Sequence, residues 1–167
     1  EQVLRNLLQS LIQELSFKAG SVRLLRPRRR RLHLAAAEGL SQAYLNKGEV
    51  RVADSPIDNR VLTENTHVIL YDVGAEPGYQ YPEEAAREGI RSVLAVPLRL
   101  RDRIVGVLRV YSAQPHRFTS EEIAMVEAVA DLGAIALENA RLHETLREKY
   151  EAAREDWAGW YRYLALS

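Results

Sequence analysis

The sequence predicts an α+β domain built around a central antiparallel sheet. Three features lead to this class: an amphipathic helix at the start of the chain, two apolar strands joined by a tight turn at Arg101-Asp102, and a long helix from Thr119. The chain has 167 residues, and 47% of them are hydrophobic. This size and composition suffice for one core of ordinary size, so we expect one folded domain with a helical extension.

The first helix is predicted by a single apolar stripe at three- and four-residue spacing, which consists of Leu4, Leu8, Leu11 and Leu15. Gly20 ends this helix. Residues 21–25 and 31–36 have the pattern of two strands and are expected to form a hairpin. The arginine-rich connection over 26–31 has two interpretations, a solvated turn and a phosphate-binding patch. The lack of interleaved aromatic residues favours the solvated turn.

The middle of the chain contains clear helix boundaries. Ser55 and Pro56 suit the first turn of a helix, because serine caps free amide groups and proline fits there, and Asn65 closes the helix. After it we expect, in order, a strand over 67–73, an irregular Gly- and Pro-rich stretch over 74–82, and a short helix over 83–88 that stops at Gly89.

The last two strands and the last helix have the strongest local signals. The strands over 91–100 and 103–112 are apolar along almost their whole length, which predicts that both of their faces are covered. Thr119 and Glu122 form a capping box, and the neighbouring apolar residues form a hydrophobic staple. The last helix therefore begins at Thr119.

Four segments follow one another in this part of the chain: Ala95-Val-Pro-Leu98, Ile104-Val-Gly-Val-Leu108, Arg117-Phe-Thr-Ser-Glu-Glu122 and Ala134-Ile-Ala-Leu-Glu-Asn-Ala-Arg-Leu142. In this order and at this spacing they resemble the core of a GAF domain. The resemblance implies a sheet of about six antiparallel strands, with the first and last helices on one face and a lid of loops and a short helix on the other. It also implies a regulatory module that binds a small molecule or a partner and signals along its terminal helices.

The composition argues against several kinds of activity. The chain contains no cysteine, which removes disulfides, thiolate zinc sites and cysteine nucleophiles. Within the resemblance, it also removes covalent bilin attachment and the thiol-dependent reduction of free methionine sulfoxide. There is no Gly-x-Ser-x-Gly turn, and the four histidines are far apart. We therefore expect no catalytic residue, no metal and no cofactor.

The net charge of the chain indicates which kinds of partner it can attract. Lysine and arginine total 23, as do aspartate and glutamate, so the formal net charge is zero. This balance gives no general attraction to nucleic acid or membrane, and no apolar run is long enough to span a bilayer. We expect a cytoplasmic piece of a longer protein that binds neither nucleic acid nor membrane. Asn46-Lys47, with distant acids, matches the family's cyclic-nucleotide signature too weakly for that ligand to be expected.

A ligand pocket is expected on one face of the last strand, where alternation places Arg109 and Tyr111 together. Burial of these polar groups is costly without partners, and the resemblance places this face under the lid. The expected lining is Tyr71, Asp72, Tyr79, Tyr81, Ser92, Leu94, Arg109 and Tyr111. Two alternatives stay open. Either the pocket holds a small anionic or aromatic ligand, or the tyrosines fill it and Arg109 pairs with Asp72 or Glu88.

The last helix has two apolar stripes. One is an approximate heptad seam that continues beyond Ala140, and the other consists of Ile123, Val126, Ala130, Gly133, Leu137 and Ala140. One stripe is expected to cover the sheet and the other to meet a second copy of the chain. The expected dimer interface is Leu8, Leu11, Leu132, Asn139 and Leu146. Residues 1–145 would form the domain, and residues 146–167 a helical signalling extension.

The expected function is signal input. The chain would be the sensor domain of a sensor kinase or transcriptional regulator, binding a small molecule non-covalently and signalling through a homodimer to an output domain in the same chain. The alternative is a dimerisation module with a degenerate pocket and no ligand. A haem or other cofactor sensor and an enzyme on the same scaffold are further rivals, and the absence of cysteine disfavours the enzyme.

Overall fold

The computed structural model describes residues 2–26 and 28–166. Its elements are α1 (Gln2–Leu15), β1 (Ala19–Arg26), β2 (Arg31–Glu38), α2 (Gln42–Leu45), β3 (Val50–Arg51), η1 (Val52–Asp54), α3 (Pro56–Glu64), β4 (Val68–Leu70), η2 (Val73–Ala75), α4 (Pro82–Glu88), β5 (Ser92–Leu100), β6 (Arg103–Ser112) and α5 (Ser120–Leu166), where η marks a short 3₁₀ helix. Pro27, in the predicted arginine-rich turn, lies outside the described residues. The chain divides into two units, Glu1–Ala134 and Ile135–Ser167, so α5 belongs to both. The boundary expected between residues 145 and 146 stays a prediction.

In the described part of the chain, six antiparallel strands form one sheet in the order β3-β2-β1-β6-β5-β4. The predicted fold class, an α+β domain with a central antiparallel sheet of about six strands, is confirmed. The central strands β5 and β6 are buried along most of their length, as their continuous apolar sequences predict. The strand predicted over 67–73 is shorter than expected, because β4 ends at Leu70 and η2 begins at Val73.

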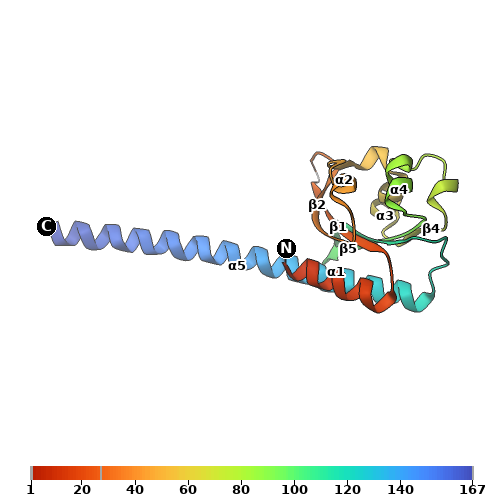
Figure 1. Ribbon diagram of the computed structural model, residues 1–167. Coiled ribbons are helices and arrows are strands. Elements are labelled where there is room, and N and C mark those ends of the chain that lie inside the picture. Colours follow the sequence, from red (N-terminus) through yellow and green to blue (C-terminus); the bar gives the residue numbers. More distant parts are fainter. Residues whose placement is uncertain (1, 27, 167) are drawn as a thin grey trace. The chain divides into compact units, whose positions relative to one another are not determined.

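One face of the sheet is covered by α1 and the first turns of α5, and the other by α2, α3 and α4 (Figure 1). The apolar stripe of α1 is buried at Leu4, Leu8 and Leu11, and Leu8 packs against Gly20 of β1. The prediction that Leu8 and Leu11 form a dimer interface is therefore wrong. Both side chains are already buried inside the domain.

The start of α5 follows its sequence signals. The backbone amide of Thr119 donates to the Glu122 carboxylate at 2.9 Å, and the amide of Glu122 donates to the Thr119 hydroxyl at 3.1 Å. Val126 and Ala130 are buried, and Gly133 lies against Leu4 of α1, where a larger residue would crowd the contact. One stripe of α5 thus covers the domain, as predicted.

The lid layer is wider than the stretch 74–88 that the sequence indicated. The helix α3 begins and ends as predicted: the Ser55 side chain accepts a hydrogen bond from the amide of Asp58, and Asn65 adopts a left-handed conformation with φ of 54°. The short helix α2 and strand β3 were not predicted. Their role is to carry Tyr44 and Val50 into the interior, where both are buried.

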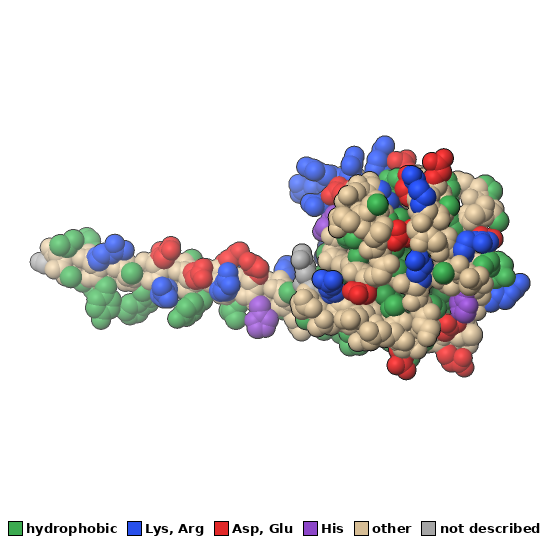
Figure 2. Space-filling view, viewed as in Figure 1, with side chains coloured by type: hydrophobic (Ala, Val, Ile, Leu, Met, Phe, Trp, Pro, Cys, Tyr) green, Lys and Arg blue, Asp and Glu red, His purple; other side chains and the backbone are tan. Residues whose placement is uncertain are grey.

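The second unit is the part of α5 from Ile135 onward. Its large apolar side chains are exposed at Ile135, Leu142, Leu146, Tyr150, Trp157, Trp160, Tyr161, Tyr163, Leu164 and Leu166. Figure 2 shows hydrophobic side chains along one side of this helix and charged ones on the other. Within residues 2–26 and 28–166, no helix combines the length and the apolar character needed to cross a membrane. This segment is an amphipathic helix whose apolar side is uncovered within its own unit.

Candidate functional site

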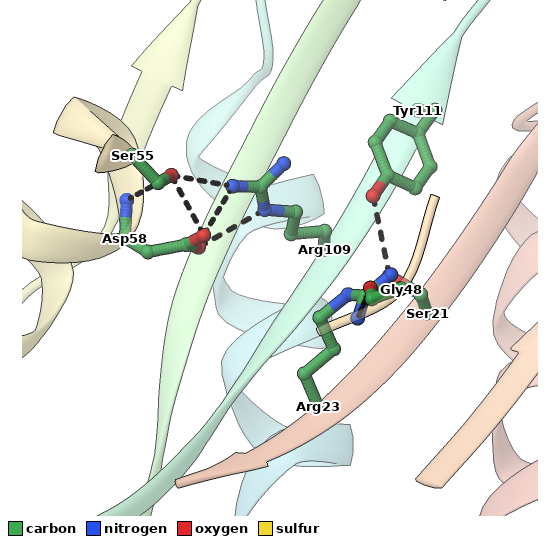
Figure 3. Close-up of polar contacts among 7 residues, drawn as sticks. All are labelled: Ser21, Arg23, Gly48, Ser55, Asp58, Arg109 and Tyr111. Carbon is green, nitrogen blue, oxygen red and sulfur yellow. Dashed lines mark hydrogen bonds and ion pairs between the residues drawn. The ribbon is translucent and has the colours of Figure 1, made fainter. Parts of the chain in front are cut away.

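Arg109 of β6 is buried beneath α3 and is bound there by a carboxylate. Its guanidinium donates from Nε to Asp58 Oδ1 at 3.1 Å and from Nη2 to Asp58 Oδ2 at 2.5 Å (Figure 3). Ser55 Oγ accepts a further hydrogen bond from Nη2 at 3.2 Å and donates one to Asp58 Oδ2 at 2.8 Å. Arg109 is 6% exposed and Asp58 is 0% exposed. The planar fork of the guanidinium matches the carboxylate, so the two charges neutralise each other.

The environment of Arg109 keeps it charged. Burial alone lowers its pKa, but the Asp58 carboxylate, followed by Tyr111, more than offsets this, and the pKa of Arg109 lies well above its ordinary value. The prediction that Arg109 holds an anionic ligand is therefore wrong, because the Asp58 carboxylate already neutralises its charge. The alternative, that Arg109 pairs with an acidic residue of the same chain, is confirmed. The partner is Asp58, and not Asp72 or Glu88 as expected.

Asp58, in the first turn of α3, was not identified as a site residue from the sequence. A signal was nevertheless present. Ile57, Asp58 and Val61 are all buried, so the acid interrupts an apolar helix face. A carboxylate in such a position requires a cation or several donors as partners.

Three tyrosines surround this ion pair. The hydroxyl of Tyr111 lies 3.2 Å from Ser21 Oγ (Figure 3), and its ring meets that of Tyr44 edge to face at a centroid distance of 6.4 Å. The hydroxyls of Tyr44 and Tyr79 are buried, and neither has a hydrogen-bond partner of acceptable geometry among the described residues. They still influence each other: burial, then Tyr111 and Tyr79, raise the pKa of Tyr44 far above its ordinary value. Buried phenol groups without partners call for an explanation.

Arg23 of β1 is a second buried arginine on the same face of the sheet, and the sequence did not indicate it. Its side chain is 5% exposed. The guanidinium donates one hydrogen bond, a long one of 3.4 Å to the carbonyl oxygen of Gly48 (Figure 3). In the described part of the chain, no carboxylate forms an ion pair with Arg23. Its charge is thus buried without a counter-charge.

Lys47, directly after α2, is a third cation in this region. Its Nζ lies 3.6 Å from the ring centroid of Tyr44 and 4.9 Å from that of Tyr81. Burial, followed by the charges of Arg109 and Arg23, lowers the pKa of Lys47 to about 7. Within residues 2–26 and 28–166, Lys47 also has no carboxylate at ion-pair distance.

Tyr71 and Asp72, two of the predicted lining residues, lie outside this interior. Tyr71 is 49% exposed, and the guanidinium of Arg117 lies over its ring at 5.1 Å. Asp72 accepts hydrogen bonds from Arg91 at 3.3 and 3.0 Å, and these bonds lower the pKa of its carboxyl. Both residues belong to the surface of the lid segment and do not line a pocket.

Ser92 and Leu94 lie on the opposite face of the sheet from Arg109. Leu94 pairs with Val110, whereas Arg109 pairs with Ala95. A bulge near the turn end of β5 shifts the register by one residue, and such a shift moves every side chain to the other face. Ser92 donates its hydroxyl to a backbone carbonyl at 2.8 Å. The prediction that Ser92 and Leu94 line the pocket is therefore wrong.

The cavity that remains is small. It measures about 10 Å³, room for about one water molecule, and it is lined by Lys47, Val50, Ser55, Pro56, Ile57, Tyr79, Gln80, Tyr81 and Arg109. Outside it, α2 and α4 border a groove of about 400 Å³, lined by Ser41, Ala43, Tyr44, Asn46, Lys47, Glu84, Arg87 and Glu88. Lys47 thus borders both spaces, and the lid is closed over the interior.

Comparison with known proteins decides the family. A family model described as the GAF domain matches residues 1–138. The chain belongs to the GAF domain family. A similar solved structure is the GAF domain from a phosphoenolpyruvate-protein phosphotransferase (ptsP) of Coxiella burnetii, with a TM-score of 0.76 and 22% identity over 86% of this chain and 85% of that one. The GAF domain/HD domain protein from Geobacter sulfurreducens has a TM-score of 0.73 and 19% identity over 84% and 93% of the two chains.

The GAF fold of this chain also occurs in an enzyme. Type II free methionine-R-sulfoxide reductase from Thermoplasma acidophilum has a TM-score of 0.65 and 23% identity over 80% of this chain and 88% of that one. No curated protein sequence matches the chain significantly. The fold alone therefore does not decide whether this GAF domain is an enzyme. In the described part of the chain, no group of three or more His, Cys, Asp or Glu side chains is arranged to hold a metal ion.

Proposed function

We propose that this GAF domain is a regulatory input domain, without catalytic activity, in a longer cytoplasmic signalling protein. It signals to an output domain in the same chain through a homodimer of helix α5. The observation that carries this proposal is the exposed apolar seam of α5. Membership of the GAF family supports the regulatory class, and the lack of cysteine in the chain supports the absence of thiol chemistry.

The seam recurs at the spacing of a heptad repeat. Leu132, Leu146 and Trp160 occupy one seam position, and Tyr150 and Trp157 occupy the other. Their side chains are between 53% and 69% exposed. A continuous apolar surface of this kind is characteristic of an interaction site. A second copy of α5 offers the same seam, so we take the partner to be another copy of this chain.

Two further features of the seam support a partner helix. Asn139, at a seam position, is exposed, and a single polar residue there favours one register over others. The seam side chains also leave two open hollows of about 420 and 600 Å³. One is lined by Asp156, Trp157, Trp160, Tyr161 and Leu164, and the other by Ala140, His143, Glu144, Leu146, Arg147 and Tyr150. Hollows on a single helix suit the knobs of a partner helix better than a small ligand.

The proposed dimer can be tested by introducing charged residues into the apolar seam of α5. The double substitution Leu146→Glu with Trp157→Glu should convert a dimer into a folded monomer, because carboxylates would have to be buried in an apolar contact. Sedimentation velocity reports the mass, and circular dichroism reports the fold. Ala152→Glu is the matched control, since it adds a carboxylate to an exposed position of the same helix outside the seam. An unchanged mass in the double variant would contradict the proposal.

A second function, dimerisation without any ligand, is favoured by the small cavity and by the internal neutralisation of Arg109. The two functions share the dimer. They differ in whether the lid side of the domain binds a molecule.

A further inference from the structure

The interior on the lid side of the sheet contains more positive than negative charge, whereas the groove outside it is lined by Glu84 and Glu88 as well as by Lys47 and Arg87. Arg23 of β1, Lys47 after α2 and Arg109 of β6 lie near one another in this interior, since each of the two arginines lowers the pKa of Lys47. Among the described residues, Asp58 is the one buried carboxylate. Because Asp58 is bound by Arg109, Arg23 and Lys47 are left without a counter-charge.

The position of Arg23 is fixed by the sheet. A Cβ atom at Gly106 of β6 would collide with the carbonyl oxygen of Arg23, so the two strands approach closely at this point. A guanidinium offers five N–H donors, and here one of them has a partner, the carbonyl of Gly48. At 5% exposure, water does not replace the missing acceptors. An oxyanion would satisfy two of these donors at once.

Lys47 lies next to Gly48, so the two unpaired cations converge on one place. The charged groups around Lys47 come from four elements: Arg23 of β1, Asp58 of α3, Glu84 of α4 and Arg109 of β6. The tyrosines beside it are Tyr44 and Tyr81, which stack on its ammonium group, and Tyr79, which lines the same cavity. A bound anion would oppose the repulsion between these cations and raise the pKa of Lys47.

The buried hydroxyl groups of Tyr44 and Tyr79 lie in the same region as Lys47. Tyr44 is 3% exposed. Its hydroxyl and that of Tyr79 have no partner at ideal hydrogen-bond geometry in the described part of the chain, but they lie close enough to interact with each other, so at least one of the two O–H groups is left to donate to a third group. A phenol O–H donates well to an anionic oxygen. Tyr79 and Lys47 line the small cavity, and Tyr44 and Lys47 line the groove outside it. Lys47 thus borders both spaces with a tyrosine in each, and Arg23 reaches the neighbouring residue Gly48.

We propose that the lid side of this domain binds a small molecule through an oxyanion group, a carboxylate, phosphate or sulfate, held by Arg23 and Lys47 with the hydroxyls of Tyr44 and Tyr79. This inference rests on the proposed regulatory function, to which it adds the chemical class of the input. Arg109 is not the anion receptor. Its role is to hold α3 against β6 through Asp58.

The groove between α2 and α4 is the route to this site. The backbone amide and the hydroxyl of Ser41, which caps α2, both donate to the Glu88 carboxylate of α4, at 2.7 and 2.5 Å. These bonds join the two lid helices beside Lys47. The cavity of about 10 Å³ and the groove of about 400 Å³ share Lys47 as a lining residue, so we expect them to join when these bonds open. Anion binding is thereby coupled to the positions of α2 and α4, as a switch requires.

The test is isothermal titration calorimetry of the full chain with sodium sulfate and, separately, sodium acetate, at an ionic strength held constant with sodium chloride. Arg23→Met and Lys47→Met each remove one proposed cation and keep most of the side-chain bulk. We expect each to weaken binding by about tenfold or more, the effect of losing one charge-assisted hydrogen bond. Arg103→Met, at an exposed arginine of β6, is the matched control and should bind as the wild type does.

Saturable binding that is weakened in both lid variants and retained in the control supports the site, and the probe that binds identifies the preferred oxyanion geometry. No saturable binding of either probe, or equal binding by all four proteins, overturns it. Thermal unfolding in buffer without sulfate gives a second readout. Arg23→Met should unfold at a higher temperature than the wild type, because it removes a buried charge that lacks a partner. A lower unfolding temperature would contradict the proposal.

The pH dependence of sulfate binding provides an independent check. Sulfate keeps its charge between about pH 6 and pH 8, whereas Lys47, with a pKa of about 7, loses its proton across that range. The affinity should therefore fall as the pH rises, and Lys47→Met should remove this dependence. Sedimentation of the same samples separates the two proposals. If the protein is a dimer that does not bind sulfate, the proposed regulatory dimer stands and the proposed anion site fails. If the protein is a monomer that binds sulfate, the anion site stands and the dimer fails.

Discussion

The two faces of the central sheet are built by alternate residues of the same strands, yet they form different kinds of interior. The face under α1 and α5 is mainly aliphatic, with Val22, Leu94, Leu98, Leu108 and Val110 buried on it. The lid face of β1 and β6 presents Ser21, Arg23, Arg109 and Tyr111 instead. Both faces are stabilised by filled volume, since apolar residues such as Val93, Ala95 and Val107 are buried on the lid face as well. Stability on the lid face depends in addition on whether each buried charge has a partner.

The lid face is where the largest effect is expected. Asp58→Ala leaves Arg109 buried and unpaired, and we expect the free energy of unfolding in urea to fall by about 3–5 kcal/mol. The double variant Asp58→Ala with Arg109→Met removes both charges and should recover much of this loss. Asp72→Ala breaks the exposed pair with Arg91 and is the control, with little expected change. If Asp58→Ala lowered the free energy of unfolding as little as the control does, the lid face would not depend on the pairing of its buried charges.

On the helix face a smaller effect with a different cause is expected. Leu8→Ala opens a cavity under β1, and the free energy of unfolding should fall by about 3 kcal/mol. Val3→Ala, at an exposed position of the same helix, is the matched control. Sedimentation should report the same mass for both variants, because Leu8 is core. If Leu8→Ala abolished the dimer without lowering the free energy of unfolding, Leu8 would belong to the dimer interface and not to the core.

The third effect is a pH dependence of stability that comes from Lys47 on the lid face, and it is the smallest of the three when expressed per pH unit. Lys47 loses its proton at about pH 7 in the folded chain, whereas an unfolded lysine keeps it to about pH 10.4. Between these values the unfolded state binds more protons, so the stability of the wild type should rise with pH relative to Lys47→Met. The slope of this difference is at most about 1.4 kcal/mol per pH unit. Parallel stability curves for the two proteins would show that Lys47 is not perturbed by its surroundings.

Much of the fold could be predicted because its signals are local. The capping box at Thr119, the cap at Ser55 and the left-handed Asn65 each act within one turn of helix. The apolar runs of β5 and β6 predicted the centre of the sheet. The site was predicted less well. Of its proposed lining, Tyr79, Tyr81 and Arg109 border the cavity, and Tyr111 packs on Tyr44.

The missed parts of the site depend on contacts between distant segments. A two-residue turn without a bulge would have paired Leu94 with Arg109, and the bulge in β5 moved Leu94 to the other face. Nothing close to Arg23 in sequence marks it as buried, and the carbonyl group to which it donates, that of Gly48, lies 25 residues away. The partner of Arg109 likewise lies 51 residues away.

The sequence by itself determined the fold family, the ends of α3 and α4, the start of α5 and the presence of an apolar seam on α5, because periodicity and capping chemistry depend on neighbouring residues. The end of α1 was expected at Gly20 and lies at Leu15. The tertiary structure decided which charges are paired. It joined Asp58 to Arg109, and among the described residues it left Arg23 and Lys47 without a carboxylate at ion-pair distance. The reason is physical: the free energy of a buried charge is determined by which groups the folded chain brings within a few ångströms of it, and sequence spacing does not encode that proximity.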